Sequence, residues 1–385
     1  FIDKGLSFVL PIFLLYLTNP SIYANLEAAL ALSILLIPLL DLGTNYYVGF
    51  IYKEKGEACF SRFNRLLLSI SLVSVAIAIP LFFLSEFFFI VVLAILRSVH
   101  INLYQYGQTK GRLTEQLISP ILTNIVASAF AVVLTLISVF FEFWENYILL
   151  SYFIFPPALF ILLNIRAIEL PRLPKLTQFD SNASLQFIRK SLIFAAPAIL
   201  NTLLVTGFAN LTKIYVLQNF GENDMVRYSF VFRLAMIVQL CHMAVSGYTF
   251  KFFLLSNNLK KMASLYALYM FALLLITACI LLTVYFANQW ISYNLLYIDP
   301  LFIAAFGYTL FWCYSVFFDF LYIRINKTKL MLVNSGVFFL TASCFYFIYG
   351  VMTPLDAAVG LFFSSVTMFI SNLLLCFINR HHLVK

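Results

Sequence analysis

The sequence predicts an all-α membrane protein with about 12 transmembrane helices in two pseudo-repeated six-helix bundles, and with both termini in the cytoplasm. Three observations predict this fold. The 385 residues are 63% hydrophobic and only 10% charged, too few charges to cover a soluble domain of this size. Apolar stretches long enough to cross a bilayer recur from end to end, and the short loops between them alternate in charge.

The apolar stretches give the expected helices in order. Each is close to the roughly 20 residues that a span requires, and in the bilayer core a helix satisfies its own backbone hydrogen bonds. The expected spans are 4–19, 22–49, 64–84, 86–106, 114–140, 146–166, 186–211, 223–250, 262–286, 290–322, 329–350 and 354–379. They use most of the chain, so no soluble catalytic domain is expected. Because Phe1 is not an initiator Met, we expect further residues upstream.

The loop charges predict the orientation. One set of loops is basic, with Lys53, Lys55, Arg62, Arg65, Lys110, Arg112, Arg166, Arg172, Lys175, Arg189, Lys190, Lys251, Lys260, Lys261, Arg324, Lys327, Lys329, Arg380 and Lys385. The alternate set is acidic, with Glu27, Glu86, Glu142, Glu145, Glu222, Asp224, Asp299 and Asp356, and Arg227 is its exception. Lys and Arg stay in the cytoplasm during insertion, so the basic loops are predicted to be cytoplasmic. The net charge of +8 therefore indicates contact with anionic membrane lipids and not with nucleic acid.

The two halves of the chain resemble each other. Lys4-Gly-Leu-Ser-Phe-Val-Leu-Pro11 aligns without a gap with Lys190-Ser-Leu-Ile-Phe-Ala-Ala-Pro197, and the fourth and tenth spans also match. We therefore expect an N-terminal bundle over 1–166, a cytoplasmic linker over 167–189 and a C-terminal bundle over 190–385. Parallel repeats of this kind place a solute path between the halves, near the midplane.

Among the ionisable residues inside expected spans, where a charge facing lipid costs about 3 kcal/mol or more, seven are candidate site residues. They are Asp41, Arg97, His100, Lys213, Arg233, His242 and Asp319. One interpretation is a wet cationic cavity in which Arg233, Arg97, His100, Lys213 and His242 contact an anionic substrate. The other is structural pairing between helices, with the two aspartates as counter-ions of an arginine. The aspartates are also candidates for binding a coupling proton or cation.

Polar side chains also form stripes at helical spacing. Arg97, His100 and Tyr104 share one face of the fourth span. A second stripe in the fourth span consists of Ser98, Asn102, Gln105 and Thr109. Its counterpart in the tenth span consists of Ser315, Asp319, Tyr322 and Asn326.

The paired motif K-x-L-x-F-x-x-P resembles the opening of each repeat in the O-antigen and polysaccharide-repeat flippases. That family belongs to the multidrug/oligosaccharidyl-lipid/polysaccharide (MOP) exporter superfamily. Asn210-Leu-Thr-Lys-Ile-Tyr-Val-Leu-Gln-Asn-Phe-Gly221, followed by Tyr228 and Arg233, is similar to the family's signature over the seventh and eighth helices. The chain departs from it at Thr212, where members often carry Asp.

The resemblance implies a flippase that moves an undecaprenyl-pyrophosphate-linked oligosaccharide from the inner to the outer leaflet of a bacterial inner membrane. It implies phosphate contact by Arg233, Arg97 and Lys213, and a polysaccharide polymerase and assembly proteins as partners. No cofactor is expected, and coupling to H⁺, Na⁺ or the membrane potential stays open.

A structural membrane scaffold is one alternative, but it would not explain polar stripes at matching places in both halves. Three other function classes compete with the flippase. A cation-coupled multidrug antiporter of the same superfamily is the alternative, although such a cavity should be rich in acids. A membrane polymerase or ligase should carry a large outer loop, and the outer loops here are short. An ATP-driven exporter is disfavoured because the chain lacks a G-x-x-x-x-G-K-[ST] motif. The six cysteines show no metal-ligand spacing.

Overall fold

The computed structural model describes residues 11–114, 116, 118–141, 145–164, 181–255, 259–291, 297–324, 327 and 329–379. Within these ranges every regular element is a helix, so the all-α prediction is confirmed there. Nine of the described helices are long and apolar enough to cross a membrane, and the segments Ile148–Leu162 and Pro300–Val316 are shorter apolar helices. Most of the predicted linker, the start of the first span, Asn326, Arg380 and Lys385 lie outside the described residues.

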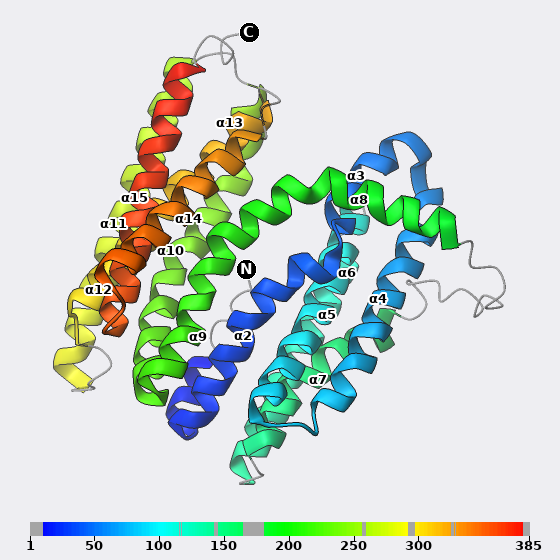
Figure 1. The fold of residues 1–385 in the computed structure, drawn as a ribbon, viewed down its shortest axis with the longest axis horizontal. Coiled ribbons are helices and arrows are strands. Elements are labelled where there is room, and N and C mark those ends of the chain that lie inside the picture. Colours follow the sequence, from blue (N-terminus) through cyan, green and yellow to red (C-terminus); the bar gives the residue numbers. More distant parts are fainter. Residues whose placement is uncertain are drawn as a thin grey trace. The chain divides into compact units, whose positions relative to one another are not determined.

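The chain divides into two compact units, Phe1–Ile214 and Tyr215–Lys385. The first contains residues 11–17, which are helical, followed by α2 (Pro20–Asp41), α3 (Thr44–Lys55), the 3₁₀ turn η1 (Gly56–Cys59), α4 (Phe60–Leu81), α5 (Glu86–Leu113), α6 (Ile118–Phe140), α7 (Glu145–Asn164), α8 (Ser181–Thr202), the π-turn η3 (Leu203–Gly207) and the first half of α9 (Phe208–Phe220). Figure 1 shows α5 among its neighbours, and it packs against α2, α3, α4, α6 and α7.

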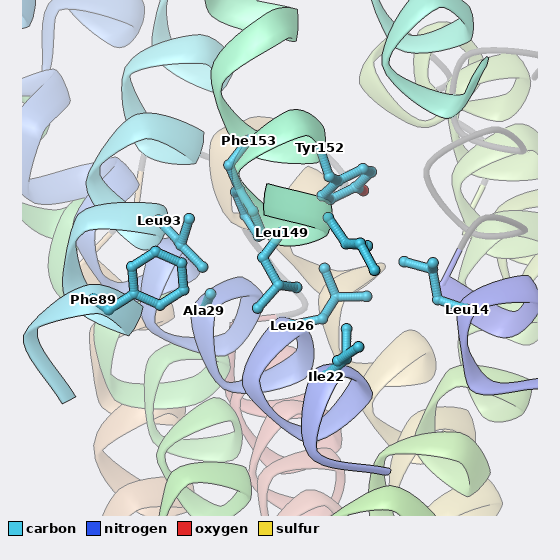
Figure 2. Close-up of a cluster of buried hydrophobic side chains, with 10 residues drawn as sticks. Leu14, Ile22, Leu26, Ala29, Phe89, Leu93, Leu149, Tyr152 and Phe153 are labelled. Carbon is cyan, nitrogen blue, oxygen red and sulfur yellow. The ribbon is translucent and has the colours of Figure 1, made fainter. Parts of the chain in front are cut away.

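The core of the first unit forms where α2, α5 and α7 meet (Figure 2). Leu26 and Ala29 of α2 face Phe89 and Leu93 of α5, and Tyr152 of α7 closes the cluster. Small side chains let helices approach closely in a membrane, and α2 is rich in buried alanines. The core therefore packs α2 against α5 and α7.

Two polar side chains of α5 also bind the backbone of α2. The Ser98 hydroxyl donates to the Ser33 carbonyl, and the Asn102 side-chain amide donates to the Ile37 carbonyl, both at 3.1 Å. These residues belong to the second polar stripe predicted on the fourth span. That stripe therefore faces a neighbouring helix at these two positions.

The single span predicted over 22–49 is wrong, because the helix is interrupted between α2 and α3. Leu42 and Gly43 take left-handed backbone angles, with φ of 48° and 75°. A Cβ atom at Gly43 would stand 2.4 Å from the Ala195 Cβ and 2.9 Å from the Ser191 carbonyl oxygen of α8. The Ser191 hydroxyl also donates to the Leu42 carbonyl at 3.0 Å. Gly43 is thus required both by the turn and by the close approach of α8.

The span predicted over 186–211 is longer in the structure. α8, η3 and α9 follow one another without a loop from Ser181 to Phe220, with Pro197 inside α8. The π-turn lies beside α2, where a Cβ atom at Gly207 would approach Leu35 Cδ2 to 2.7 Å. π-turns are frequent at functional sites, so the residues that follow this turn are candidates for a functional site.

The second unit comprises the rest of α9 and α10 (Glu222–Leu255), α11 (Leu259–Ile291), α12 (Pro300–Val316), α13 (Phe318–Arg324), α14 (Lys329–Tyr349) and α15 (Pro354–Ile378). α12 packs against α10, α11, α13 and α15. The span predicted over 290–322 starts too early, because α11 continues to Ile291 and α12 begins only at Pro300. Asp299 is the N-cap of α12, and its carboxylate accepts from the Phe302 N–H at 3.3 Å.

Candidate functional site

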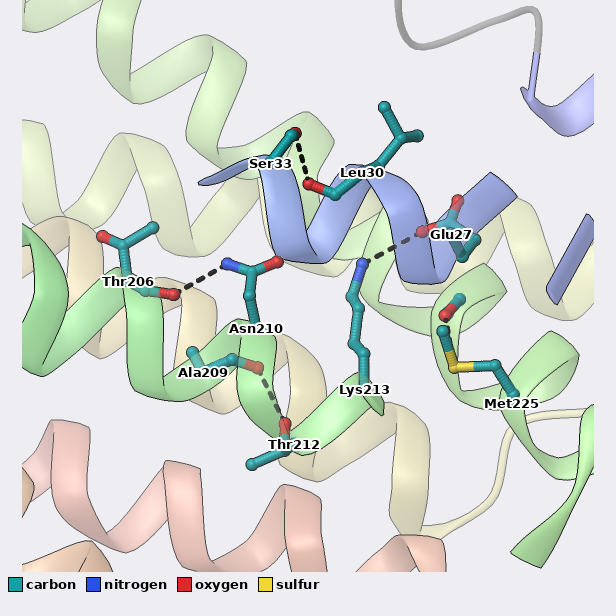
Figure 3. A network of polar contacts seen from close by, with 10 residues as sticks. Glu27, Leu30, Ser33, Thr206, Ala209, Asn210, Thr212, Lys213 and Met225 are labelled. Atoms are coloured by element: carbon teal, nitrogen blue, oxygen red, sulfur yellow. Dashed lines mark hydrogen bonds and ion pairs between the residues drawn. The ribbon is translucent and has the colours of Figure 1, made fainter. Parts of the chain in front are cut away.

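The most deeply buried ion pair of the described residues joins α9 to α2. Lys213 Nζ donates to Glu27 Oε2 at 3.1 Å, and Figure 3 shows the lysine extending from α9 toward the carboxylate. Lys213 is 9% exposed and Glu27 is 0% exposed. The assignment of Glu27 to an outer loop is wrong, because Glu27 lies inside α2. Sequence reasoning missed this partner because it lies 186 residues from Lys213.

Two other polar side chains of α9 donate to backbone carbonyls of the preceding turn (Figure 3). The Asn210 side-chain amide donates to the Thr206 carbonyl, and the Thr212 hydroxyl donates to the Ala209 carbonyl, both at 2.7 Å. These are local contacts to the preceding turn. Lys213 differs from both in that its charged end reaches a second helix.

Arg97 and His100 lie on the side of α5 that meets α6 and α7. The Arg97 guanidinium carbon stands 5.9 Å from the centre of the Tyr152 ring. His100 is buried, and its Nε2 pairs with Asn124 Oδ1 of α6 at 2.8 Å. His100 and Tyr104 both contact the Phe160 ring edge-on, so this part of the predicted face is observed. Arg97 forms no ion pair with a carboxylate of the described residues.

Asp41 caps the start of α3. Its carboxylate accepts from the Thr44 hydroxyl at 2.5 Å and from the Asn45 N–H at 3.2 Å. The predicted counter-ion role is not observed, since neither ion pair found in the described ranges includes Asp41. A buried carboxylate at a helix start satisfies backbone N–H groups that have no partner within the helix.

His242 lies in an aromatic cluster between α10, α11 and α12. Its Nδ1 pairs with the Tyr269 hydroxyl at 2.5 Å, and that hydroxyl donates to the Cys313 carbonyl at 3.1 Å. The imidazole also meets the Trp312 ring edge-on, with 6.1 Å between centres. The contacts of His242 are therefore those of a packed interhelical residue.

Arg233 and Asp319 lie in the second unit. Arg233 is 5% exposed within α10, well away from both helix ends. Asp319 lies in the first turn of α13 and takes part in neither ion pair of the described segments. The pairing of Arg97 or Arg233 with either aspartate, which was the structural alternative, is not seen among them.

A buried amide network near Asp319 was missed by sequence reasoning. The Tyr322 hydroxyl donates to Asn372 Oδ1 at 2.8 Å, and Asn334 Nδ2 donates to the same oxygen at 2.5 Å. The Ser371 hydroxyl then donates to Asn334 Oδ1 at 2.7 Å. The network joins α13, α14 and α15. Tyr322 was expected on a polar stripe, but its partners lie on helices that no local spacing connects to it.

Arg227, the one basic residue predicted on the outer side, is explained by the structure. Its guanidinium contacts the Asp299 carboxylate at 2.7 Å, with both side chains partly exposed. The pair links the start of α10 to the start of α12. In the parts of the chain described, no group of three or more His, Cys, Asp or Glu side chains is arranged to hold a metal.

Solved structures with a similar fold are transporters of one superfamily. An inward-facing multidrug resistance MATE family transporter of the MOP superfamily matches with a TM-score of 0.72 and 16% identity, over 99% of this chain and 95% of its own. An outward-facing transporter of that family matches with a TM-score of 0.64 and 14% identity, over 99% and 92%. The chain has the MATE fold.

A third match is a MOP superfamily transporter from Pyrococcus furiosus, with a TM-score of 0.65 and 14% identity over 100% of this chain and 94% of its own. No protein-family model and no curated protein matches the sequence. The MATE fold and the nine apolar helices together make the chain a multi-pass membrane protein. The chain is therefore similar in fold to transporters of the MOP superfamily.

Proposed function

We propose that the chain is a flippase for an undecaprenyl-pyrophosphate-linked oligosaccharide, such as an O-antigen or similar polysaccharide repeat unit. It would move the head group from the inner to the outer leaflet of a bacterial inner membrane by alternating access. The basic loops support cytoplasmic termini by the positive-inside rule. The membrane potential favours outward movement of an anionic lipid by about 2.3 kcal/mol per charge per 100 mV.

The physical problem that such a protein solves is the hydration of the head group. Each unpaired hydroxyl costs several kcal/mol in hydrocarbon, so an oligosaccharide does not cross a bilayer unassisted. A polar route between two helix bundles would let the head group cross while the lipid tail stays in the bilayer.

The observation that carries the proposal is which charged side chains within the helices have a partner of opposite charge. Arg97 has an aromatic contact and no carboxylate partner among the described residues, while Glu27 and Asp41 have partners of their own. An arginine retained inside a membrane without a carboxylate suits a phosphate group, which its planar fork binds through two hydrogen bonds. The P. furiosus transporter, which has a similar fold, has a binding pocket of reverse polarity that suggests a different function for it, so this fold is compatible with more than one pocket polarity.

The test is transbilayer movement of a fluorescent undecaprenyl-pyrophosphate oligosaccharide in liposomes that contain the purified protein. Arg97→Ala should slow movement at least about tenfold, because a charge-assisted contact to phosphate is lost. Arg97→Lys should retain part of the activity. Arg112→Ala is the matched control, since Arg112 is exposed at the end of the same helix.

Full movement by a folded Arg97→Ala protein would remove Arg97 from the mechanism. The same assay applied to Arg233→Ala tests a buried arginine of α10, and loss of movement there is expected.

A cation-coupled multidrug antiporter is the second candidate. The similar solved structures include multidrug resistance transporters, and Glu27, Asp41 and Asp319 place three acids within helices. Proton- or sodium-driven uptake of an organic cation, without lipid movement, would favour this candidate.

A further inference from the structure

The Lys213–Glu27 pair is a buried ion pair between two helices of the first unit. Removing two charges from water costs several kcal/mol for each, and a buried pair often contributes little net stability. Ionisable residues within a membrane are therefore more often retained for function. The pair joins α9 to α2 directly after the π-turn, at 3.1 Å and with Glu27 fully buried.

The chemistry of the pair suggests competition for one cation. A Lys ammonium is a compact point charge that binds carboxylate and phosphate oxygens alike. Glu27 presents the same kind of oxygen that a pyrophosphate would present. The Glu27 carboxylate and an incoming pyrophosphate therefore compete for Lys213.

We infer that Glu27 is an internal competitor that displaces the pyrophosphate head group from Lys213. This inference rests on the proposed flippase function and deepens it by assigning the release step. When substrate binds, the ammonium turns from the Glu27 carboxylate to a pyrophosphate oxygen. When Glu27 returns to Lys213, the head group is set free, and no bond is made or broken.

The position of the pair assigns the release to the outer side. Glu27 lies about two turns after the start of α2, and Lys213 about two turns before the end of α9, which is roughly 10 Å in each case. The basic residues at the opposite ends of these spans, Lys53 and Lys55 beyond α2 and Arg189 and Lys190 before α9, predict that both of these helix ends lie on the outer face. A competitor in the outer third of the membrane acts late in an outward passage.

Other described charges near α2 have contacts of their own. On the helices packed against it, Arg97 lies over Tyr152, and His100 pairs with Asn124. Lys190 of α8 is exposed. Of these described cations, Lys213 is the one whose ammonium forms an ion pair with the Glu27 carboxylate.

The test is binding of inorganic pyrophosphate to the purified protein in detergent, measured by titration calorimetry. Glu27→Gln should tighten binding about tenfold or more, because the competing charge is removed while the shape is kept. Lys213→Met should abolish this gain when combined with Glu27→Gln. Glu222→Gln is the matched control, an exposed glutamate at the start of α10, and should bind as the unaltered protein does.

Glu27→Asp keeps the charge but shortens its reach, so it should give an intermediate affinity, and it keeps the test open if Glu27→Gln does not fold. Pyrophosphate binding that is unchanged in folded Glu27→Gln and Glu27→Asp would overturn the inference and leave the flippase standing. No pyrophosphate binding by any variant, with binding of tetraphenylphosphonium that Glu27→Gln abolishes, would overturn the flippase as well.

Discussion

At the scale of single residues, the structure assigns most of the intramembrane polar groups to specific contacts. His100 pairs with Asn124, His242 with Tyr269, and Asp41 with the start of α3. Position 43 requires glycine, because a Cβ atom there would stand only 2.4 Å from the Ala195 Cβ of α8. A substitution at Gly43 therefore tests how closely α8 packs against the turn between α2 and α3.

Gly43→Ala should lower the free energy of unfolding by roughly 2–4 kcal/mol, from left-handed strain together with overpacking against Ala195. Gly350→Ala is the matched control, because Gly350 has a similar φ of 72° and its Cβ position would meet only the Met352 Cε at 3.7 Å, an ordinary contact. It should cost only about 1–2 kcal/mol. Thermal unfolding of both variants in detergent measures the difference. Equal losses would contradict the close approach of α8.

At the scale of elements, apolar runs predicted which of the described segments are helical better than they predicted where each helix ends. The break at Leu42 and Gly43 was not predicted, because Gly inside an apolar run is also tolerated in a continuous helix. What decides it is α8, whose Ser191 contacts Leu42 from 149 residues away. The Asp299–Pro300 start of α12 carried a local signal, the N-cap followed by Pro, and could have been predicted.

The start of α12 depends on Asp299 in two ways, as a helix cap and as the partner of Arg227. Asp299→Ala should cost about 1–2 kcal/mol, most of it from the lost cap. Asp299→Asn keeps a capping oxygen and should cost less than about 1 kcal/mol, because a partly exposed ion pair contributes little. Unfolding measured at low and high salt checks this. A loss as large for Asn as for Ala would show that the ion pair dominates.

At the scale of the whole molecule, composition and charge alternation predicted a multi-pass all-α protein, and the MATE fold agrees with that prediction. Seven ionisable residues were selected from the sequence because buried charge is costly. Their partners were not predicted, since Glu27 lies 186 residues from Lys213 with no spacing to connect them. The two-repeat arrangement and the domain boundary at 167–189 stay predictions.

The central claim is that the cargo is an anionic lipid-linked oligosaccharide. The most direct test is one preparation of liposomes, containing the purified protein, that is offered both a fluorescent undecaprenyl-pyrophosphate oligosaccharide and tetraphenylphosphonium. We expect movement of the lipid far above that in protein-free vesicles, and no protein-dependent uptake of the cation. Uptake of the cation driven by a proton or sodium gradient, with the lipid left in its original leaflet, would contradict the claim.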